Sequence, residues 1–153
     1  MAKEKMFFAD EDDLPQPKLE TKSSIRNYRY VYVIPIGTLS VGADSVGVYT
    51  YSPTSLINGP FMEHGYAILP DLSSKELVKE TIVVSYGEVE PSLDVTMGKC
   101  RAVLIQIRDA QTADLLCSCR AEGVSIEASI SALQNALERA IDAIAKQLRP
   151  LLG

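Results

Sequence analysis

Apolar and polar residues alternate along two neighbouring stretches in the last third of the chain, which predicts a β-hairpin over Cys100–Glu122. The turn-rich segment Asp109–Ala113 separates the two stretches. Pairing Arg108 with Asp114 would gather the larger apolar side chains on one face, because successive residues of a strand point to opposite faces. That face would hold Val103, Ile105, Ile107, Leu115, Cys117, Cys119 and Ala121. A register slipped by one residue would bury the polar set instead, so burial of apolar surface favours this pairing.

The hairpin is followed by apolar residues at three- and four-residue intervals, which predict a long amphipathic helix over Ile126–Leu148. Ser125 precedes it as a candidate N-cap. The apolar stripe comprises Ile126, Ile130, Leu133, Leu137, Ile141, Ile144 and Leu148. We expect this stripe to cover the apolar face of the hairpin.

Short β-branched and aromatic runs predict further strands before the hairpin. They lie at Tyr28–Pro35, Val46–Tyr51, Tyr66–Leu69 and Thr81–Tyr86, with Gly87 marking the exit of the last one. The pattern as a whole predicts an α+β domain. Its sheet would be mixed and mostly antiparallel, and helices would cover one face of the C-terminal hairpin.

Two local signals predict helices between these strands. Ser52 followed by Pro53 suits a helix start, whereas Pro60 predicts a kink and an end near Gly65. Further along, Ser73 and Glu76 have the spacing of a capping box, so a short helix should begin at the residue after Ser73.

Residues 1–26 contain few large apolar side chains, which predicts a flexible acidic arm ahead of a single α+β domain over residues 27–149. The densest charge run, Asp10–Asp13, lies in this arm. A chain of 153 residues can bury a sizeable core without disulfides or metals.

The net charge of −5 and the scattered basic residues argue against binding to nucleic acid or to anionic lipid surfaces. No stretch approaches the roughly 20 apolar residues that cross a bilayer, so direct membrane insertion is not expected. The N-terminus lacks the apolar core of a signal peptide, which predicts a cytoplasmic protein. The alternative is that an export signal preceded Met1 and was removed.

Few residues are candidates for chemistry. The chain has one histidine, His64, and three cysteines, Cys100, Cys117 and Cys119. A structural zinc site usually needs four such ligands in paired clusters, so we expect the thiols to be buried as small apolar groups. In the register above, Cys100 would pair with Glu122, away from the other thiols. We expect His64 to lie at a helix C-terminus.

Acidic residues and glycines give no stronger signal. We expect three acids to lie in a solvated loop after the Thr81–Tyr86 strand: Glu88, Glu90 and Asp94. Three glycines are too widely spaced for a phosphate-binding loop: Gly37, Gly42 and Gly47. We therefore predict no catalytic, cofactor-binding or metal-binding residue, and no cofactor.

The stretch Val103–Gly123, with the following helix, resembles the closing half of curli-secretion-lipoprotein and TolB amino-terminal-like domains. In those domains a strand ending in Asp-Ala-x-Thr-Gly leads into a return strand and an amphipathic helix. Ala113 stands where the family usually has glycine, which implies a different turn. The segments Val33–Pro35 and Gly65–Leu69 resemble the start of small uncharacterised lipoproteins of the Gram-negative envelope, so the resemblance covers about 28–148.

This resemblance implies a non-catalytic, envelope-associated interaction or assembly domain on the periplasmic face, with other envelope proteins as partners. A lipid anchor would belong to the precursor. The alternative is a small-molecule-binding protein or a thiol-dependent enzyme that uses Cys117 or Cys119 together with His64.

Overall fold

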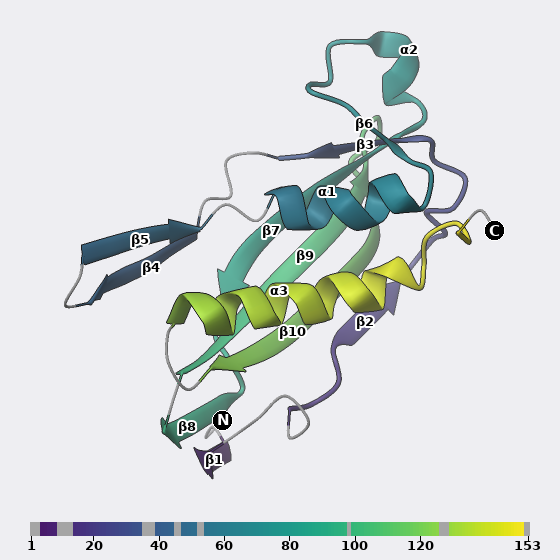
Figure 1. Ribbon diagram of the computed structural model, residues 1–153. Helices are drawn as coiled ribbons and strands as arrows, with labels where there is room; N and C mark the ends of the chain where they lie inside the picture. Colours follow the sequence, from purple (N-terminus) through teal and green to yellow (C-terminus); the bar gives the residue numbers. More distant parts are fainter. Residues whose placement is uncertain are drawn as a thin grey trace.

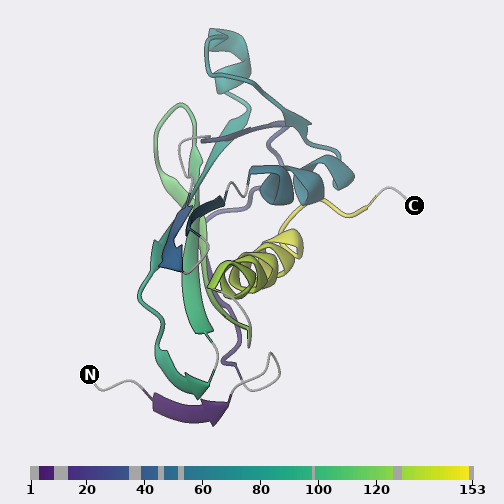
Figure 2. The ribbon, with the colours of Figure 1, turned by 60° about the vertical axis from the view of Figure 1, so that its left-hand side comes forward.

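The computed structural model describes residues 4–8, 14–34, 39–44, 47–51, 54–97, 99–125 and 129–151. A six-stranded sheet forms one layer, and helices α1 (Thr54–Glu63) and α3 (Ser129–Ala145) form the other. Both helices lie on the same face of the sheet (Figures 1 and 2). This arrangement confirms the α+β prediction, including the C-terminal hairpin covered on one face by helices.

The six-stranded sheet has the order β2-β10-β9-β7-β3-β6. The strands are β2 (Lys18–Thr21), β3 (Tyr30–Val33), β6 (Ala67–Ile68), β7 (Thr81–Val89), β9 (Lys99–Asp109) and β10 (Leu115–Ser125). β3 runs parallel to β6 and β7, whereas the pairs β7–β9, β9–β10 and β10–β2 are antiparallel. The prediction that β7 ends at Tyr86 is wrong, because its pairing with β9 continues to Val89.

The predicted hairpin is present, but its register differs from the predicted one. Arg108 pairs with Leu115 and not with Asp114. An irregularity then shifts the pairing again, so that Cys117 lies opposite Ile107. The sequence pattern cannot detect a total shift of two residues, because side chains of a strand return to the same face after two positions.

The faces of the hairpin are therefore largely as predicted, apart from the bulge. Leu116 joins the core, whereas Leu115 is only half-buried, because the extra residue turns the strand at this point. The remaining predicted positions are all buried in the core: Val103, Ile105, Ile107, Cys117, Cys119 and Ala121.

The hairpin turn is built around Asp109. Its Oδ1 accepts hydrogen bonds from the backbone N–H groups of Gln111 at 2.7 Å and Thr112 at 2.9 Å. Ala113 has φ = 65°, so the left-handed position that favours glycine is retained with an alanine in it.

Helix α3 starts and ends inside the predicted range. β10 continues through Ser125, so the prediction that this residue caps the helix is wrong, and Ile126 lies outside the described residues. After Ala145 the chain forms a turn, yet Leu148 is still buried in the core.

The predicted apolar stripe of α3 packs on the hairpin. It is wider than predicted because alanines flank the larger residues, and its buried members are Ala132, Leu133, Ala136, Leu137, Ala140, Ile141 and Ile144. At Gly123 the helix backbone meets the strand backbone, since a Cβ there would lie 2.1 Å from Ala136 N and 2.3 Å from Ala132 O. Only glycine fits this contact.

Side chains of α3 also bond to the edge of β10 beyond the short strand β2. Asn135 Oδ1 accepts from Val124 N–H at 3.0 Å, and Arg139 Nη1 donates to Glu122 O at 2.6 Å. β2 pairs with β10 only along Cys117–Arg120. Two helix side chains thus continue the hydrogen bonding where the edge strand stops.

Helix α1 continues through Pro60 as one helix, ends at Glu63 near the predicted Gly65, and buries Ile57 and Phe61. Ser52 and Pro53, its predicted start, lie outside the described residues. The helix is followed by Tyr66, whose ring meets that of Phe61 edge-on at 5.5 Å.

The short helix α2 (Lys75–Val78) is capped one residue later than predicted. Ser74 is the N-cap, and its Oγ accepts from Leu77 N–H at 3.3 Å. Ser73 instead donates its hydroxyl to Asp71 Oδ1 at 2.6 Å. The predicted capping box at Ser73 is therefore wrong, because this serine already has a partner in the preceding turn.

The prediction that no packed element precedes residue 27 is also wrong. Lys18–Thr21 forms the edge strand β2, and the flanking Leu14 and Ile25 are 5% and 1% exposed. The acidic run Asp10–Asp13 lies outside the described residues.

Two further pairs of strands lie outside the six-stranded sheet. β1 (Glu4–Phe8) runs parallel to β8 (Leu93–Met97), and β4 (Leu39–Asp44) runs antiparallel to β5 (Gly47–Tyr51). Figure 1 shows β4–β5 projecting to the left of the body and β1–β8 at its lower end. The sequence predicted only the second strand of the β4–β5 ribbon. Among the described residues, no helix combines the length and apolar character needed to cross a membrane.

Candidate functional site

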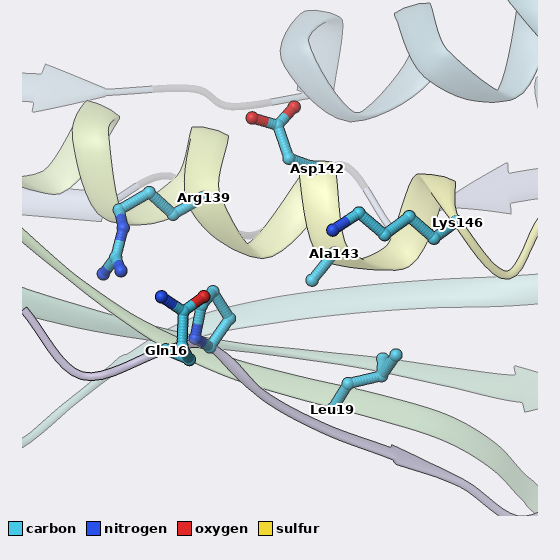
Figure 3. Close-up of a pocket in the computed structure, with 7 residues that line it drawn as sticks. Gln16, Leu19, Arg139, Asp142, Ala143 and Lys146 are labelled. Atoms are coloured by element: carbon cyan, nitrogen blue, oxygen red, sulfur yellow. The ribbon is translucent and has the colours of Figure 1, made fainter. Parts of the chain in front are cut away.

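A hollow on the described surface lies between the edge strand β2 and helix α3 (Figure 3). It has a volume of about 360 Å³. Its lining comes from the β2 segment and from one flank of the helix: Gln16, Pro17, Leu19, Arg139, Asp142, Ala143 and Lys146.

The helix positions its four lining residues through its own repeat. Residues 139, 143 and 146 are spaced three or four apart, so they lie on one flank of α3 and of the turn that follows it. Arg139 and Ala143 point toward the β2 segment, whereas Asp142 points to the other side of the helix (Figure 3). The small side chain of Ala143 leaves space between two cations.

Arg139 also fixes the β2 segment in place. Its guanidinium donates to Glu122 O through Nη1 at 2.6 Å and to Pro15 O through Nη2 at 3.0 Å. One side chain therefore joins α3, β10 and the approach to β2, and it does so through backbone carbonyls.

A second hollow of about 400 Å³ lies at the C-terminal ends of the same strand and helix. Its lining residues are Thr21, Lys22, Ser23, Ser24, Arg26 and Gln147. Thr21 and Gln147 are joined at 3.5 Å from Thr21 Oγ1 to Gln147 Oε1. We call the two hollows together the β2–α3 groove.

The groove is basic although the chain is acidic. Four cations line it, Arg139, Lys146, Lys22 and Arg26, against the single carboxylate of Asp142. The ion pairs found between described residues are Arg101–Glu88 and Arg120–Glu122, so no groove cation is paired with a carboxylate there. The groove therefore has a local excess of positive charge although the whole chain has a net charge of −5.

Two of the candidate thiols are buried beneath α3. Cys117 and Cys119 are free thiols with exposures of 1% and 0%. Burial raises the pKa of Cys117, an effect partly offset by Thr21, whose Oγ1 lies 4.0 Å from the sulfur. Burial and the neighbouring Cys117 raise the pKa of Cys119 to about 11. Both groups therefore stay protonated at neutral pH and are poor nucleophiles.

Cys100 lies on the opposite face of the sheet, near a buried carboxylate. It pairs with Val124, so the predicted pairing with Glu122 is wrong, yet its Sγ lies 3.9 Å from Glu122 Oε2 as a diagonal neighbour. Glu122 is 3% exposed, accepts a hydrogen bond from the Ser92 hydroxyl, and has Arg120 Nη1 at 3.3 Å. These contacts give the buried carboxyl group its hydrogen-bonding partners.

His64 follows the C-terminal end of α1, as predicted, and its side chain is hydrogen-bonded to the C-terminal segment of the chain. Its Nδ1 donates to Arg149 O at 2.5 Å. The Arg149 guanidinium stacks 4.3 Å from the centre of the Tyr66 ring and donates to Gly65 O at 2.7 Å. In the described part of the chain, no hydrogen bond joins His64 to a cysteine.

The predicted loop acids are partly misplaced. Glu88 belongs to β7 and receives two hydrogen bonds from the Arg101 guanidinium, and the backbone carbonyl of Glu90 accepts from Arg120. Asp94 lies in β8, and its side chain is outside the described set. No cluster of three or more His, Cys, Asp and Glu side chains suited to a metal ion occurs among the described residues.

Sequence reasoning missed the groove because it treated residues 1–26 as an arm. The available signal was the helical spacing of Arg139, Ala143 and Lys146 on one flank of a predicted helix. The strand that completes the groove has only four residues, two of them charged.

Comparisons with known proteins give a fold and no family. No family model matches the sequence, and no curated protein matches it. Two structures of the PelC dodecamer from Paraburkholderia phytofirmans share the fold, with 14% and 12% identity and TM-scores of 0.57 and 0.56. They cover 88% and 89% of this chain and 100% of the PelC chain. The lipoprotein GNA1162 from Neisseria meningitidis also matches, with 16% identity, a TM-score of 0.44, and coverage of 77% of this chain and 94% of that one.

Proposed function

We propose that this protein is a non-catalytic, envelope-associated domain that assembles with further copies of itself. The observation that supports assembly is the fold shared with PelC, whose chains form a dodecamer and match this chain over their whole length.

The two ribbons outside the main sheet give independent physical support for assembly. An isolated pair of strands is marginally stable in water, because neither of its faces is covered. Both β1–β8 and β4–β5 are two-stranded, and β4–β5 projects from the body in Figure 1. Strands or side chains of neighbouring copies in an assembly would stabilise such ribbons.

The mass of the full chain in solution tests this part of the proposal. We expect light scattering after gel filtration to give a multiple of the 16.7 kDa monomer mass. Replacing residues 39–51 with a short Gly-Ser linker should reduce the assembly size while the far-UV spectrum of the body is kept. A protein that stays monomeric at all concentrations up to about 100 μM would exclude self-association, because a stable assembly forms at lower concentrations than this.

The envelope location rests on the resemblance of Val103–Gly123 and the following helix to envelope domains. Fractionation of native cells, followed with an antibody to this domain, tests it. We expect the protein in the envelope fractions. A protein found wholly in the cytosol would exclude the location and leave the assembly test unaffected.

The thiol-enzyme alternative has little support in the geometry. The two core thiols are buried with raised pKa values, and the one histidine donates to a backbone carbonyl. A nucleophilic thiol needs the opposite setting, a lowered pKa and an adjacent base.

A further inference from the structure

The β2–α3 groove holds positive charge that the described part of the protein does not neutralise. Arg139 donates to two backbone carbonyls, and Arg26 Nη2 lies 3.5 Å from Lys146 O. Neither contact cancels a unit of charge. The one carboxylate of the lining, Asp142, points away from the β2 segment in Figure 3. A ligand with several negative charges would therefore be attracted to this groove.

The strand side of the groove provides main-chain hydrogen-bonding groups as well as charge. β2 is the edge of the six-stranded sheet, and β10 is its one strand partner in the described part of the chain. A sheet edge can accept another strand, which is a common way of binding an extended peptide.

We infer that the β2–α3 groove binds an extended acidic segment of a partner protein, which adds to the edge of β2 and places its carboxylates beside Lys146, Lys22 and Arg26. This names the partner chemistry of the interaction domain proposed above, and it rests on that proposal.

The two sides of the groove match such a segment in length. The residues that line its helix side run from 139 to 147. Residues 139–145 belong to α3 and span about 9 Å at about 1.5 Å per residue, and the turn residues Lys146 and Gln147 extend this side further. Four residues of an extended strand span about 13 Å. Leu19 and Thr21 both lie opposite core-facing cysteines of β10 and line one hollow each. Alternate side chains of an added strand would point the same way and reach both hollows.

A peptide fits this groove better than other polyanions. Nucleic acids and acidic polysaccharides provide negative charge, but they lack the regular alternation of N–H and C=O groups that pairs with a strand edge. The chain as a whole carries −5, so a long polyanion would also be repelled by the rest of the surface.

Binding can be measured with a fluorescent eight-residue peptide in which glutamate and valine alternate, added to the full-length protein. We expect saturable binding that weakens as salt is raised, because the charges are near the surface. Amide signals of Lys18–Thr21 should shift in NMR spectra together with those of α3. A peptide of the same sequence with N-methylated backbone amides keeps the charge and the side chains but has no main-chain donor to pair as a strand, so it should bind about tenfold more weakly.

A charge-matched pair of variants locates the site. The double variant Lys22→Glu and Lys146→Glu reverses two exposed groove cations, and it should weaken peptide binding about tenfold. Lys75→Glu with Lys79→Glu makes the same change in net charge at exposed positions on and next to α2, outside the groove. The control should bind within about twofold of the unchanged protein.

Several results would overturn the inference. Equal weakening by both variants would show a response to net charge alone, and equal binding of the N-methylated peptide would exclude strand addition. Tighter binding of a short polygalacturonate than of the peptide would assign the groove to a sugar polymer. Absence of peptide binding by a chain that still assembles at its expected mass would reject the groove and leave the proposed assembly standing.

Discussion

The two sides of helix α3 differ in packing and in charge. The side facing the hairpin is dry and closely packed, and at Gly123 its backbone touches the strand without an intervening side chain. The flank facing β2 is open and charged, with Ala143 leaving a hollow between Arg139 and Lys146. The first side determines where the helix lies. The second is then free to bind something else.

This difference shows why apolar periodicity located the helix but not the site. Packing constrains size and shape at every buried position, whereas an exposed flank constrains only charge and solubility. Substitutions on the two sides should accordingly differ in cost by several kcal/mol.

The largest effect is expected at the closest contact. Gly123→Ala would put a methyl group into the backbone of Ala132 and Ala136, which should destabilise the protein by about 3 kcal/mol or more. Urea unfolding measures this. Gly87→Ala in β7 is the matched control, because no atom lies within 4 Å of its added Cβ, and it should be nearly neutral. Equal effects of the two changes would show that α3 does not rest on β10 at Gly123.

A smaller loss is expected from a cavity on the same side of the helix. Leu137 is fully buried, so Leu137→Ala should cost about 2–5 kcal/mol in the free energy of unfolding. Gln134 lies one turn earlier on the exposed face, and Gln134→Ala should cost under about 0.5 kcal/mol. A near-neutral Leu137→Ala would mean that the packed side has been assigned to the wrong residues.

The packed side should also protect its thiols. Burial raises the pKa of Cys119 to about 11 from 9.0, so the folded state retains this proton. Its contribution to stability is complete below pH 9 and is lost as pH rises from about 9 to 11. In a Cys100→Ser background at pH 8, Cys119 should react with a thiol reagent about a hundredfold more slowly when folded than in denaturant. Fast reaction of the folded protein would restore the thiol-enzyme alternative.

The smallest effect is expected on the open flank. Lys146 is exposed and forms no ion pair with a described residue, so Lys146→Gln should change the free energy of unfolding by less than about 0.5 kcal/mol. The same urea experiment measures it. A loss above 1 kcal/mol, which would be large for a surface position, would mean that this flank contributes to folding as much as the packed side does.

The parts of the fold predicted from the sequence are those with a long, regular apolar pattern. The stripe of α3 and the two faces of the hairpin followed directly from periods of 3.6 and 2. The register did not, because a shift of two residues around the bulge at Leu115–Cys117 leaves the faces unchanged. The cap of α2 was misplaced by one position, since Ser73 and Ser74 are both suitable caps and only the contact with Asp71 decides between them.

The groove could not be assembled from the sequence, because its two sides are far apart in the chain. Thr21 pairs with Cys117, 96 positions later, and no local pattern specifies that pairing. Pro15 and Pro17 precede a strand of four residues that contains Lys18 and Glu20, which reads as a polar tail. The cations of the groove are scattered in the sequence, and they form a cluster only because the β2 segment lies beside α3 in the fold.

The pairing of β2 with β10 also sets an order of events during biosynthesis. A ribosome adds about 5–20 residues per second, so the segment Lys18–Thr21 is made roughly 5–20 seconds before its partner, Cys117–Arg120, exists. The hairpin and α3 are contiguous in the chain and can fold on each other as soon as they emerge, whereas β2 must wait for them. The groove therefore forms only after α3 has been made, and a partner that requires both of its sides cannot recognise the chain before then.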